Sequence, residues 1–166
     1  KFPVYRESPQ KMYIPRYYGI KNYGKPVTSK IKDGDDIDLP FKGELRDYQI
    51  NIVNTFMKSV DNDNGGGLLE VPCGRGKTIC ALNIISKIKK KTLVIVHKGF
   101  LLNQWIERIE QFLPNAKIGK IQGQVIDIED KDIVIGMLQS LSMKDYPCEM
   151  FSSFGLTVVD EVHHIA

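Results

Sequence analysis

Apolar residues along the chain form two alternating patterns: short continuous runs, and stripes that recur every three or four positions. Runs of the length expected for buried strands occur at Leu68–Val71, Lys91–His97, Lys117–Gly123, Asp132–Leu138 and Leu156–Val159. Stripes with helical spacing occur at Arg46–Val60, from Lys77 to Ile88, and at Gly99–Phe112. Because strands alternate with helices, we expect an α/β fold with a mainly parallel sheet whose two faces are covered by helices.

The same spacing predicts which side chains of two helices point into the core. In the helix at Arg46–Val60 they follow one another at steps of four: Tyr48, Ile52, Phe56 and Val60. In the helix at Gly99–Phe112 they are Leu101, Leu102, Trp105, Ile109 and Phe112. Trp105, the sole tryptophan, is therefore expected to be a core residue and not a platform for base stacking.

A glycine-containing loop joins the run at Leu68–Val71 to the helix that begins at Lys77. The strict phosphate-loop pattern, G-x-x-x-x-G-K-[ST], would have a glycine where this chain has Val71. A strand, a loop and a helix in this order are nevertheless the context of a phosphate-binding loop, because glycines let backbone N–H groups and the helix N-terminus face an anion. Lys77 can then reach the terminal phosphates, and the Thr78 hydroxyl can bind Mg²⁺. The alternative is a surface turn followed by an ordinary helix.

Two acids, Asp160 and Glu161, follow the last apolar run directly. The carboxyl ends of strands in open α/β sheets are where ligands bind. Asp160 can hold Mg²⁺ through water, and Glu161 can polarise an attacking water. The alternative is a strand that emerges into solvent with charges at its end. Since the loop and the acid pair occur together and in the right order, we interpret the loop as a phosphate-binding site.

Composition limits the organisation of the chain. With 166 residues and 42% hydrophobic content, one core is expected, in one domain or in one domain with an arm. No apolar run has membrane-spanning length and no secretory signal is seen, so we expect an intracellular protein without a membrane partner. The three cysteines have no metal-ligand spacing, and Cys73 is interpreted as a small residue that fits the loop. The chain begins with Lys1 and ends six residues after Asp160, which suggests a piece of a longer protein.

Residues 1–40 are interpreted as a basic, aromatic N-terminal arm. Lys1–Lys32 contains eight Lys or Arg residues and one acid, so its formal charge is +7, whereas that of the whole chain is +3. The same stretch contains six aromatic residues: Phe2, Tyr5, Tyr13, Tyr17, Tyr18 and Tyr23. This combination suits nucleic-acid binding, but a strand that packs its tyrosines onto the main domain is also consistent, and we favour packing. The acidic stretch Asp33–Asp38 is the expected boundary.

Five short motifs together resemble a known family. In chain order they are "LRDYQ" (Leu45–Gln49), "PCGRGKT" (Pro72–Thr78), "VHKGFLLNQW" (Val96–Trp105), "IGMLQSL" (Ile135–Leu141) and "DEVHH" (Asp160–His164). They resemble the first RecA-like lobe of superfamily 2 DExH helicases, particularly the branch of DNA-repair and transcription helicases and the helicases of large DNA viruses. An apolar residue at the position of Val71 is common in that branch. The resemblance covers residues 41–166, and it implies a second lobe that this sequence lacks.

The resemblance also implies roles for individual residues. The nucleotide would be bound by Arg46, Gln49, Cys73, Gly74, Arg75, Gly76, Lys77 and Thr78, with the Arg75 side chain in water. Catalysis would rest on Lys77, Asp160 and Glu161, and Mg²⁺ on Thr78 and Asp160. His163 would couple nucleotide state to the nucleic-acid site, although a core histidine is the alternative. The nucleic-acid backbone would contact Lys98, Gly99, Gln104, Gly136, Gln139 and Ser140.

The expected function is that of an ATP-dependent helicase or translocase on nucleic acid, with DNA favoured over RNA and with ATP and Mg²⁺ as cofactors. Without the second lobe, the fragment alone is expected to be nearly inactive. Two other readings remain open, a phosphate-loop NTPase of another class and a non-catalytic nucleic-acid-binding module with a relict nucleotide site. The expected location is the nucleus or cytoplasm, or the virion or cytoplasmic factory of a virus. Nothing in the sequence indicates the oligomeric state.

Overall fold

The computed structural model describes residues 4–60, 65–72 and 74–164, apart from the side chain of His164. In chain order, the elements are β1 (Arg6–Ser8), β2 (Lys11–Tyr13), α1 (Arg16–Tyr23), α2 (Asp47–Ser59), α3 (Lys77–Ile88), β3 (Thr92–Val96), α4 (Gly99–Phe112), β4 (Ile118–Gln122), β5 (Val125–Asp127), β6 (Ile133–Met137), α5 (Leu138–Ser142) and β7 (Leu156–Val159). Short 3-10 helices lie at Cys148–Phe151 and Val162–His164. No helix in these ranges is long and apolar enough to cross a membrane.

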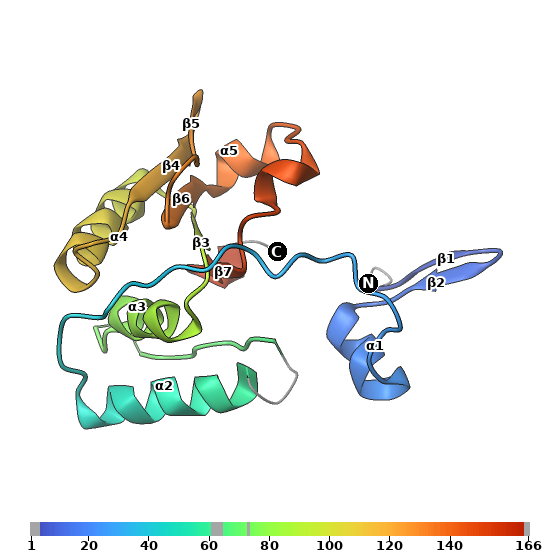
Figure 1. Ribbon diagram of the computed structural model, residues 1–166, viewed down its shortest axis with the longest axis horizontal. Helices are drawn as coiled ribbons and strands as arrows, with labels where there is room; N and C mark the ends of the chain where they lie inside the picture. The colour runs from blue at the N-terminus through green and yellow to red at the C-terminus, as the bar shows by residue number, and fades with distance from the viewer. Residues whose placement is uncertain (1–3, 61–64, 73, 165–166) are drawn as a thin grey trace.

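The centre of the molecule is a five-stranded sheet in the order β5-β4-β6-β3-β7 (Figure 1). Strands β4, β6, β3 and β7 run parallel, and β5 pairs antiparallel with β4. The prediction of an α/β fold with a mainly parallel sheet is confirmed. Of the predicted elements, α4 and β7 have the expected bounds and α3 begins at Lys77 as expected.

The two faces of the sheet carry separate apolar clusters, because neighbouring residues of a strand point to opposite faces. On one face, Val94 and Val96 of β3 and Ile133 and Ile135 of β6 pack in the core cluster that includes α3 and α4. On the other face, Leu93 and Val134 pack with Leu141 of α5 and with the segment around Phe151. The strands are therefore covered on both sides, as their continuous apolar sequences predict.

The predicted strand at Leu68–Val71 is wrong. This stretch joins neither sheet; Val71 is buried, but Leu68 is 75% exposed. A strand needs a neighbour to pair its backbone groups, and apolar character alone does not provide one. The stretch lies instead across a cavity from β7, and both line its walls.

The inward stripe predicted for α2 is confirmed in part: Ile52 and Phe56 pack against an apolar cluster, but the most buried residues lie one position along, a shift of the stripe. The buried residues of this helix are Gln49 and Val53, whereas Tyr48, Ile52 and Phe56 are only partly buried. Val53 packs against Cys80 and Ile84 of α3 in a second apolar cluster. The shift arises because a polar side chain, Gln49, occupies a buried position that an apolar pattern does not reveal.

The N-terminal arm does not pack its tyrosines as predicted. Its hairpin of β1 and β2 and its helix α1 lie to one side of the main sheet (Figure 1), and α1 contains no buried residue. Five tyrosines are between 44% and 75% exposed: Tyr5, Tyr13, Tyr17, Tyr18 and Tyr23. Of these rings, that of Tyr17 reaches the lobe, where its hydroxyl lies against Gly65, yet it too stays 44% exposed.

The sequence predicted that the lobe begins at residue 41, but in the structure it begins earlier. The Asp35 N–H donates to the Ser153 carbonyl at 2.7 Å, and the Lys91 N–H donates to the Asp35 carbonyl at 2.8 Å. Ile37 and Leu39 are 9% and 5% exposed and belong to the main core cluster. The acidic boundary stretch is thus an ordered part of the lobe.

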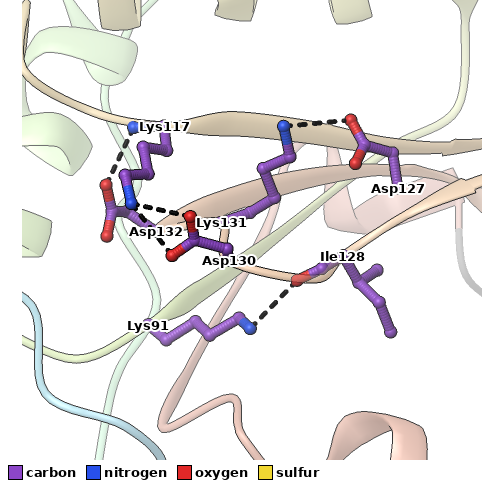
Figure 2. A network of polar contacts seen from close by, with 7 residues as sticks. All are labelled: Lys91, Lys117, Asp127, Ile128, Asp130, Lys131 and Asp132. Atoms are coloured by element: carbon purple, nitrogen blue, oxygen red, sulfur yellow. Dashed lines mark hydrogen bonds and ion pairs between the residues drawn. The ribbon is translucent and has the colours of Figure 1, made fainter.

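A polar network holds the edge of the sheet where the parallel strands begin (Figure 2). Lys117, just before β4, contacts the Asp130 carboxylate at 2.8 Å, and its backbone N–H donates to Asp132 at 2.8 Å. Lys91 donates to the Ile128 carbonyl at 3.1 Å. Together these contacts tie the loop before β6 to the starts of β3 and β4, on the edge opposite the strands' carboxyl ends.

We expect the Lys117–Asp130 pair to stabilise the fold in a pH-dependent way. The hydrogen bond from Lys117 holds the pKa of the Asp130 carboxyl below 3.8, and the same bond raises the pKa of Lys117 above 10.5. The stabilisation is therefore present above pH 3.8 and lost as pH falls through the lowered pKa; it is also lost as pH rises through the raised pKa of Lys117. Asp130→Asn should melt below wild type at pH 7, and the two should converge at pH well below 3.8.

Asparagine is the suitable replacement because Asp130 has a φ of 53°, a left-handed conformation that asparagine tolerates. Both partners are largely exposed, so the difference in melting temperature should also disappear in about 1 M salt. Glu129→Gln removes a charge from the same loop and serves as the control. A difference that persists in high salt would show that the effect is not electrostatic.

Candidate active site

The carboxyl ends of three parallel strands bring the predicted site residues to one edge of the sheet. Strand β3 leads into Lys98, β6 leads into α5, and β7 leads into Asp160 and Glu161. Lys77, Thr78, Asp160 and Glu161 all line one cavity of about 600 Å³. The convergence expected from the sequence is therefore confirmed, although the loop is not preceded by a paired strand.

Lys77 and Glu161 form an ion pair across this cavity, with Nζ and Oε1 3.2 Å apart. Glu161 is also 3.4 Å from His163, between Oε2 and Nδ1. The Lys77 and Glu161 side chains are 36% and 33% exposed, so solvent screens their attraction and the pair contributes at most about 1 kcal/mol. An incoming polyphosphate can displace Glu161 from Lys77 at little cost.

The acid pair is held in a defined backbone conformation. The Asp160 N–H donates to the Ile95 carbonyl at 3.0 Å, which continues the pairing of β7 with β3 by one residue. Glu161 has a φ of 55°, a region that residues with a side chain rarely adopt and that is frequent at functional sites. The chain therefore turns sharply after Asp160, and Glu161 faces Lys77.

The loop before α3 is predicted to bind phosphate and is called the phosphate loop below; its glycines have left-handed conformations. Gly74 and Gly76 have φ values of 75° and 81°, and Gly76 is the residue that precedes the first turn of α3. This geometry places the amino end of α3, with its unpaired N–H groups, at the cavity. Cys73 lies outside the described residues.

Gln49 braces the loop, a contact that the sequence did not indicate. Its side chain is nearly buried; Oε1 accepts from the Arg46 N–H at 2.9 Å, and Nε2 donates to the Arg75 carbonyl at 3.2 Å. The Tyr48 hydroxyl donates to the same carbonyl at 3.4 Å. The predicted contacts of Gln49 and Arg46 with a nucleotide stay predictions. In this structure the Gln49 side chain bonds two backbone groups, one of which is the N–H of Arg46 itself.

Arg75 is exposed, as expected, but its guanidinium does not simply extend into water. It lies over the ring of Tyr48, 5.6 Å from the ring centre. This stacking adds a third contact between α2 and the phosphate loop, after the two hydrogen bonds to the Arg75 carbonyl.

The oxygen donors at this edge fit Mg²⁺. The Thr78 hydroxyl at the start of α3 and the Asp160 carboxylate line the same cavity. Within the described ranges no group of three His, Cys, Asp or Glu side chains could form a protein-only metal cage. Mg²⁺ suits such a sparse donor set, because it takes one or two protein oxygens and completes its shell with phosphate and water.

Of the residues predicted to contact nucleic acid, all but one are at least partly exposed. Lys98, Gly99, Gln104 and Gln139 are exposed, and Gln139 donates to the His97 carbonyl at 2.8 Å. Ser140 is half-buried, and its hydroxyl accepts from the Gly123 N–H at 2.9 Å.

Gly136 is the exception, and its predicted contact with nucleic acid is wrong for this structure. It is buried within β6, where a Cβ atom would approach Leu141 Cδ1 to 2.8 Å. At this position the glycine lies under the Leu141 side chain of α5 and not at the surface.

Comparisons with known proteins identify the family. Residues 42–166 match the family described as "Type III restriction enzyme, res subunit". The chain therefore belongs to this family, and the predicted likeness to superfamily 2 helicases with a RecA-like lobe is confirmed.

Two curated relatives carry helicase or translocase names. The chain is 37% identical, over 99% of its length, to the "Putative ATP-dependent RNA helicase" of Acanthamoeba polyphaga mimivirus. It is 32% identical, over 90% of its length, to the "DNA 3'-5' translocase XPB2" of Sulfurisphaera tokodaii. It covers 32% and 33% of these proteins, so the chain spans about a third of their length.

A solved structure supports the fold. The Sulfolobus solfataricus SWI2/SNF2 ATPase core in complex with dsDNA matches with a TM-score of 0.59 and 22% identity, over 79% of this chain and 28% of that one. At this identity the likeness shows the RecA-like fold and nothing further.

Two glycine substitutions should separate backbone strain from contact with Gln49. Gly74→Ala and Gly76→Ala both place a Cβ at positive φ, which costs about 1–2 kcal/mol. A Cβ at Gly74 meets nothing within 4 Å, whereas one at Gly76 would collide with Gln49 Nε2. Gly76→Ala should therefore lower the free energy of unfolding more than Gly74→Ala does, as measured by urea denaturation.

On a Gln49→Ala background the two substitutions should cost about the same, because the colliding amide is gone. Equal costs already in the wild-type background would contradict the bracing role given to Gln49.

Proposed function

We propose that this chain is the ATP-binding lobe of an ATP-dependent nucleic-acid helicase or translocase. The observation that carries this proposal is the meeting of Lys77, Thr78, Asp160 and Glu161 around one cavity at the carboxyl ends of the strands. A phosphate loop opposite two acids is the arrangement that phosphoryl transfer from a nucleotide requires. Membership of the family and the names of the relatives support ATP as the nucleotide.

The residues of the site have complementary tasks in this proposal. The Lys77 ammonium leaves Glu161 and neutralises charge on the terminal phosphates, while N–H groups at the start of α3 hold their oxygens. Glu161, released from Lys77, accepts a hydrogen bond from the attacking water and orients it. Thr78 and Asp160 would hold Mg²⁺, which supplies further positive charge at the phosphates.

His163 can couple a change in the contacts of Glu161 to the protein surface. It contacts Glu161 and is itself 67% exposed, so a change in the Lys77–Glu161 pair alters the partner of a surface residue. The earlier alternative, a core histidine, does not agree with this exposure. Coupling to a nucleic-acid site through His163 belongs to the proposal.

The type of nucleic acid and the presence of a second lobe are also part of the proposal. DNA is favoured over RNA, supported by the relative named as a DNA translocase, although another relative is named as an RNA helicase. A second lobe, supported by the longer length of these relatives, would supply the arginine residues that complete the cleft. An intracellular location, viral or cellular, is proposed with them.

Substitutions in the cavity test the chemistry in the full-length protein. Lys77→Ala should lower the nucleic-acid-stimulated ATPase rate by at least about 100-fold, because it removes a charge that stabilises the transferred group. Glu161→Gln should reduce turnover to a similar extent while leaving ATP binding intact, since the phosphate-binding groups are unchanged. Lys87→Ala, an exposed lysine at the far end of the same helix, is the control.

The same assay separates the candidate functions. A phosphate-loop enzyme of another class would hydrolyse nucleotide without stimulation by nucleic acid, and a binding module would not hydrolyse it. Glu161→Gln with the parent turnover rate would show that the role given to Glu161 is wrong.

The arm is proposed to contact nucleic acid, because its tyrosines are exposed and Arg16 lies over the ring of Tyr17 at 5.6 Å. Replacing Lys11, Arg16, Lys21 and Lys25 together with alanine should weaken binding of all sequences about equally. It should also flatten the fall of affinity with salt, because fewer counterions are released. A fluorescence-anisotropy titration at two salt concentrations measures both effects.

A control variant should replace four lysines of the lobe that lie outside the arm: Lys42, Lys58, Lys87 and Lys120. It changes the net charge equally and should leave the salt dependence closer to that of wild type. If the arm were only structural packing, the arm variant would keep the salt slope and melt at a lower temperature.

A further inference from the structure

The only tryptophan of the chain extends the apolar core into the candidate active site. Trp105 lies on α4, is 2% exposed, and belongs to the main core cluster with Leu102 and Ile109. Its Nε1–H donates to Oδ2 of Asp160 at 2.8 Å. The sequence predicted the core position correctly, but it did not predict that the polar edge of the indole would contact a carboxylate of the site.

This contact fixes the orientation of one side chain. An indole can only donate, and a buried donor without an acceptor is costly, so Trp105 needs the Asp160 oxygen. The indole itself is held by the packing of α4 on the sheet. Asp160 is meanwhile held at its backbone by the Ile95 carbonyl at 3.0 Å. With the backbone and Oδ2 both fixed, the direction of the other carboxylate oxygen is also fixed.

We propose that Trp105 is the positioning residue for Asp160, holding Oδ2 so that Oδ1 is presented to the Mg²⁺ that accompanies the nucleotide. This inference rests on the proposed function, because it assigns Trp105 a task at that same site. A partner in the outer shell that orients a metal-binding carboxylate commonly changes metal affinity by about 10- to 100-fold. A residue that merely filled the core would change stability and leave metal affinity unaltered.

The position of Trp105 gives the contact a second consequence. Gln104, the preceding residue on α4, is exposed and belongs to the set proposed to contact nucleic acid. One turn of one helix thus carries a surface residue and the donor to Asp160. A nucleic acid that displaced α4 would therefore also move the indole relative to β7 and change how the carboxylate is presented.

The test compares Trp105→Phe with Ile109→Val in the full-length protein. Phenylalanine keeps an aromatic ring in the core but has no donor, whereas Ile109→Val trims a fully buried side chain on the same helix without touching Asp160. Binding of a fluorescently labelled ATP analogue is titrated with Mg²⁺, and binding is repeated in EDTA.

For Trp105→Phe, we expect the Mg²⁺ concentration at half-maximal binding to rise about tenfold, with unchanged binding in EDTA. Ile109→Val should lower the melting temperature and leave the Mg²⁺ midpoint unchanged. A Trp105→Phe protein with the wild-type midpoint would overturn the proposal and leave Trp105 as a core residue only.

A double-mutant cycle examines the bond without any nucleotide. Trp105→Phe, Asp160→Ala and the double variant are unfolded in urea, and their free energies of unfolding are compared. We expect Asp160→Ala to change the equilibrium constant of unfolding about fivefold less in the Trp105→Phe background than in wild type. Additive effects would overturn the proposal. If wild type binds no nucleotide at any Mg²⁺ concentration, the proposed function fails, whereas a non-additive cycle still supports Trp105 as the group that holds Asp160.

Discussion

The parallel pairing of β7 with β3 is the contact on which the candidate site depends. Val159 lies opposite Ile95, and the next residue, Asp160, still donates its N–H to that strand. Because a strand alternates its faces, a slip of one residue would move Val158 out of the core cluster and carry Asp160 away from both Trp105 and the cavity. A strand of four residues, three of them apolar, therefore sets the position of the acids through its register.

The phosphate loop depends on a different support. It is held by α2, through the amide of Gln49 and the hydroxyl of Tyr48 on the Arg75 carbonyl, and by the stacking of Arg75 on Tyr48. The two halves of the site thus rest on separate parts of the structure, the acids on the sheet and the loop on a helix pair. The weak, solvent-screened contact of Lys77 with Glu161 is a direct link between them. Such a link leaves the two halves able to separate around a ligand.

Much of the fold could be predicted because its signals are local. The apolar stripe of α4 and the apolar run of β7 gave correct bounds, and the lysine at the start of α3 marked the loop. The errors arose where a residue's environment depends on distant partners. Leu68–Val71 looks like a strand but pairs with no strand in the described residues, and the tyrosines of the arm look like core residues but remain largely exposed.

In the candidate site, too, the sequence predicted which residues meet but not the contacts that depend on distant partners. Sequence order was sufficient to bring Lys77 and Glu161 together, whereas the amide of Gln49 on the loop and the indole of Trp105 on Asp160 depend on rotamers that no spacing encodes. Gly136 was assigned to the surface because its motif resembles a nucleic-acid contact, yet it is buried in β6 beneath the side chain of Leu141.

Strand β7 is the last strand of the sheet, and its outer edge can promote self-association of the protein. Within the described residues, β7 pairs only with β3, and its other side faces the cavity wall where Leu68 is 75% exposed. An uncovered strand edge next to apolar side chains is a template for a foreign strand, and neither a charge nor a proline interrupts Leu156–Val159. In any preparation that leaves this edge open, self-association should begin there, and a lysine in place of Thr157, which is already exposed, is the change that would most directly discourage it.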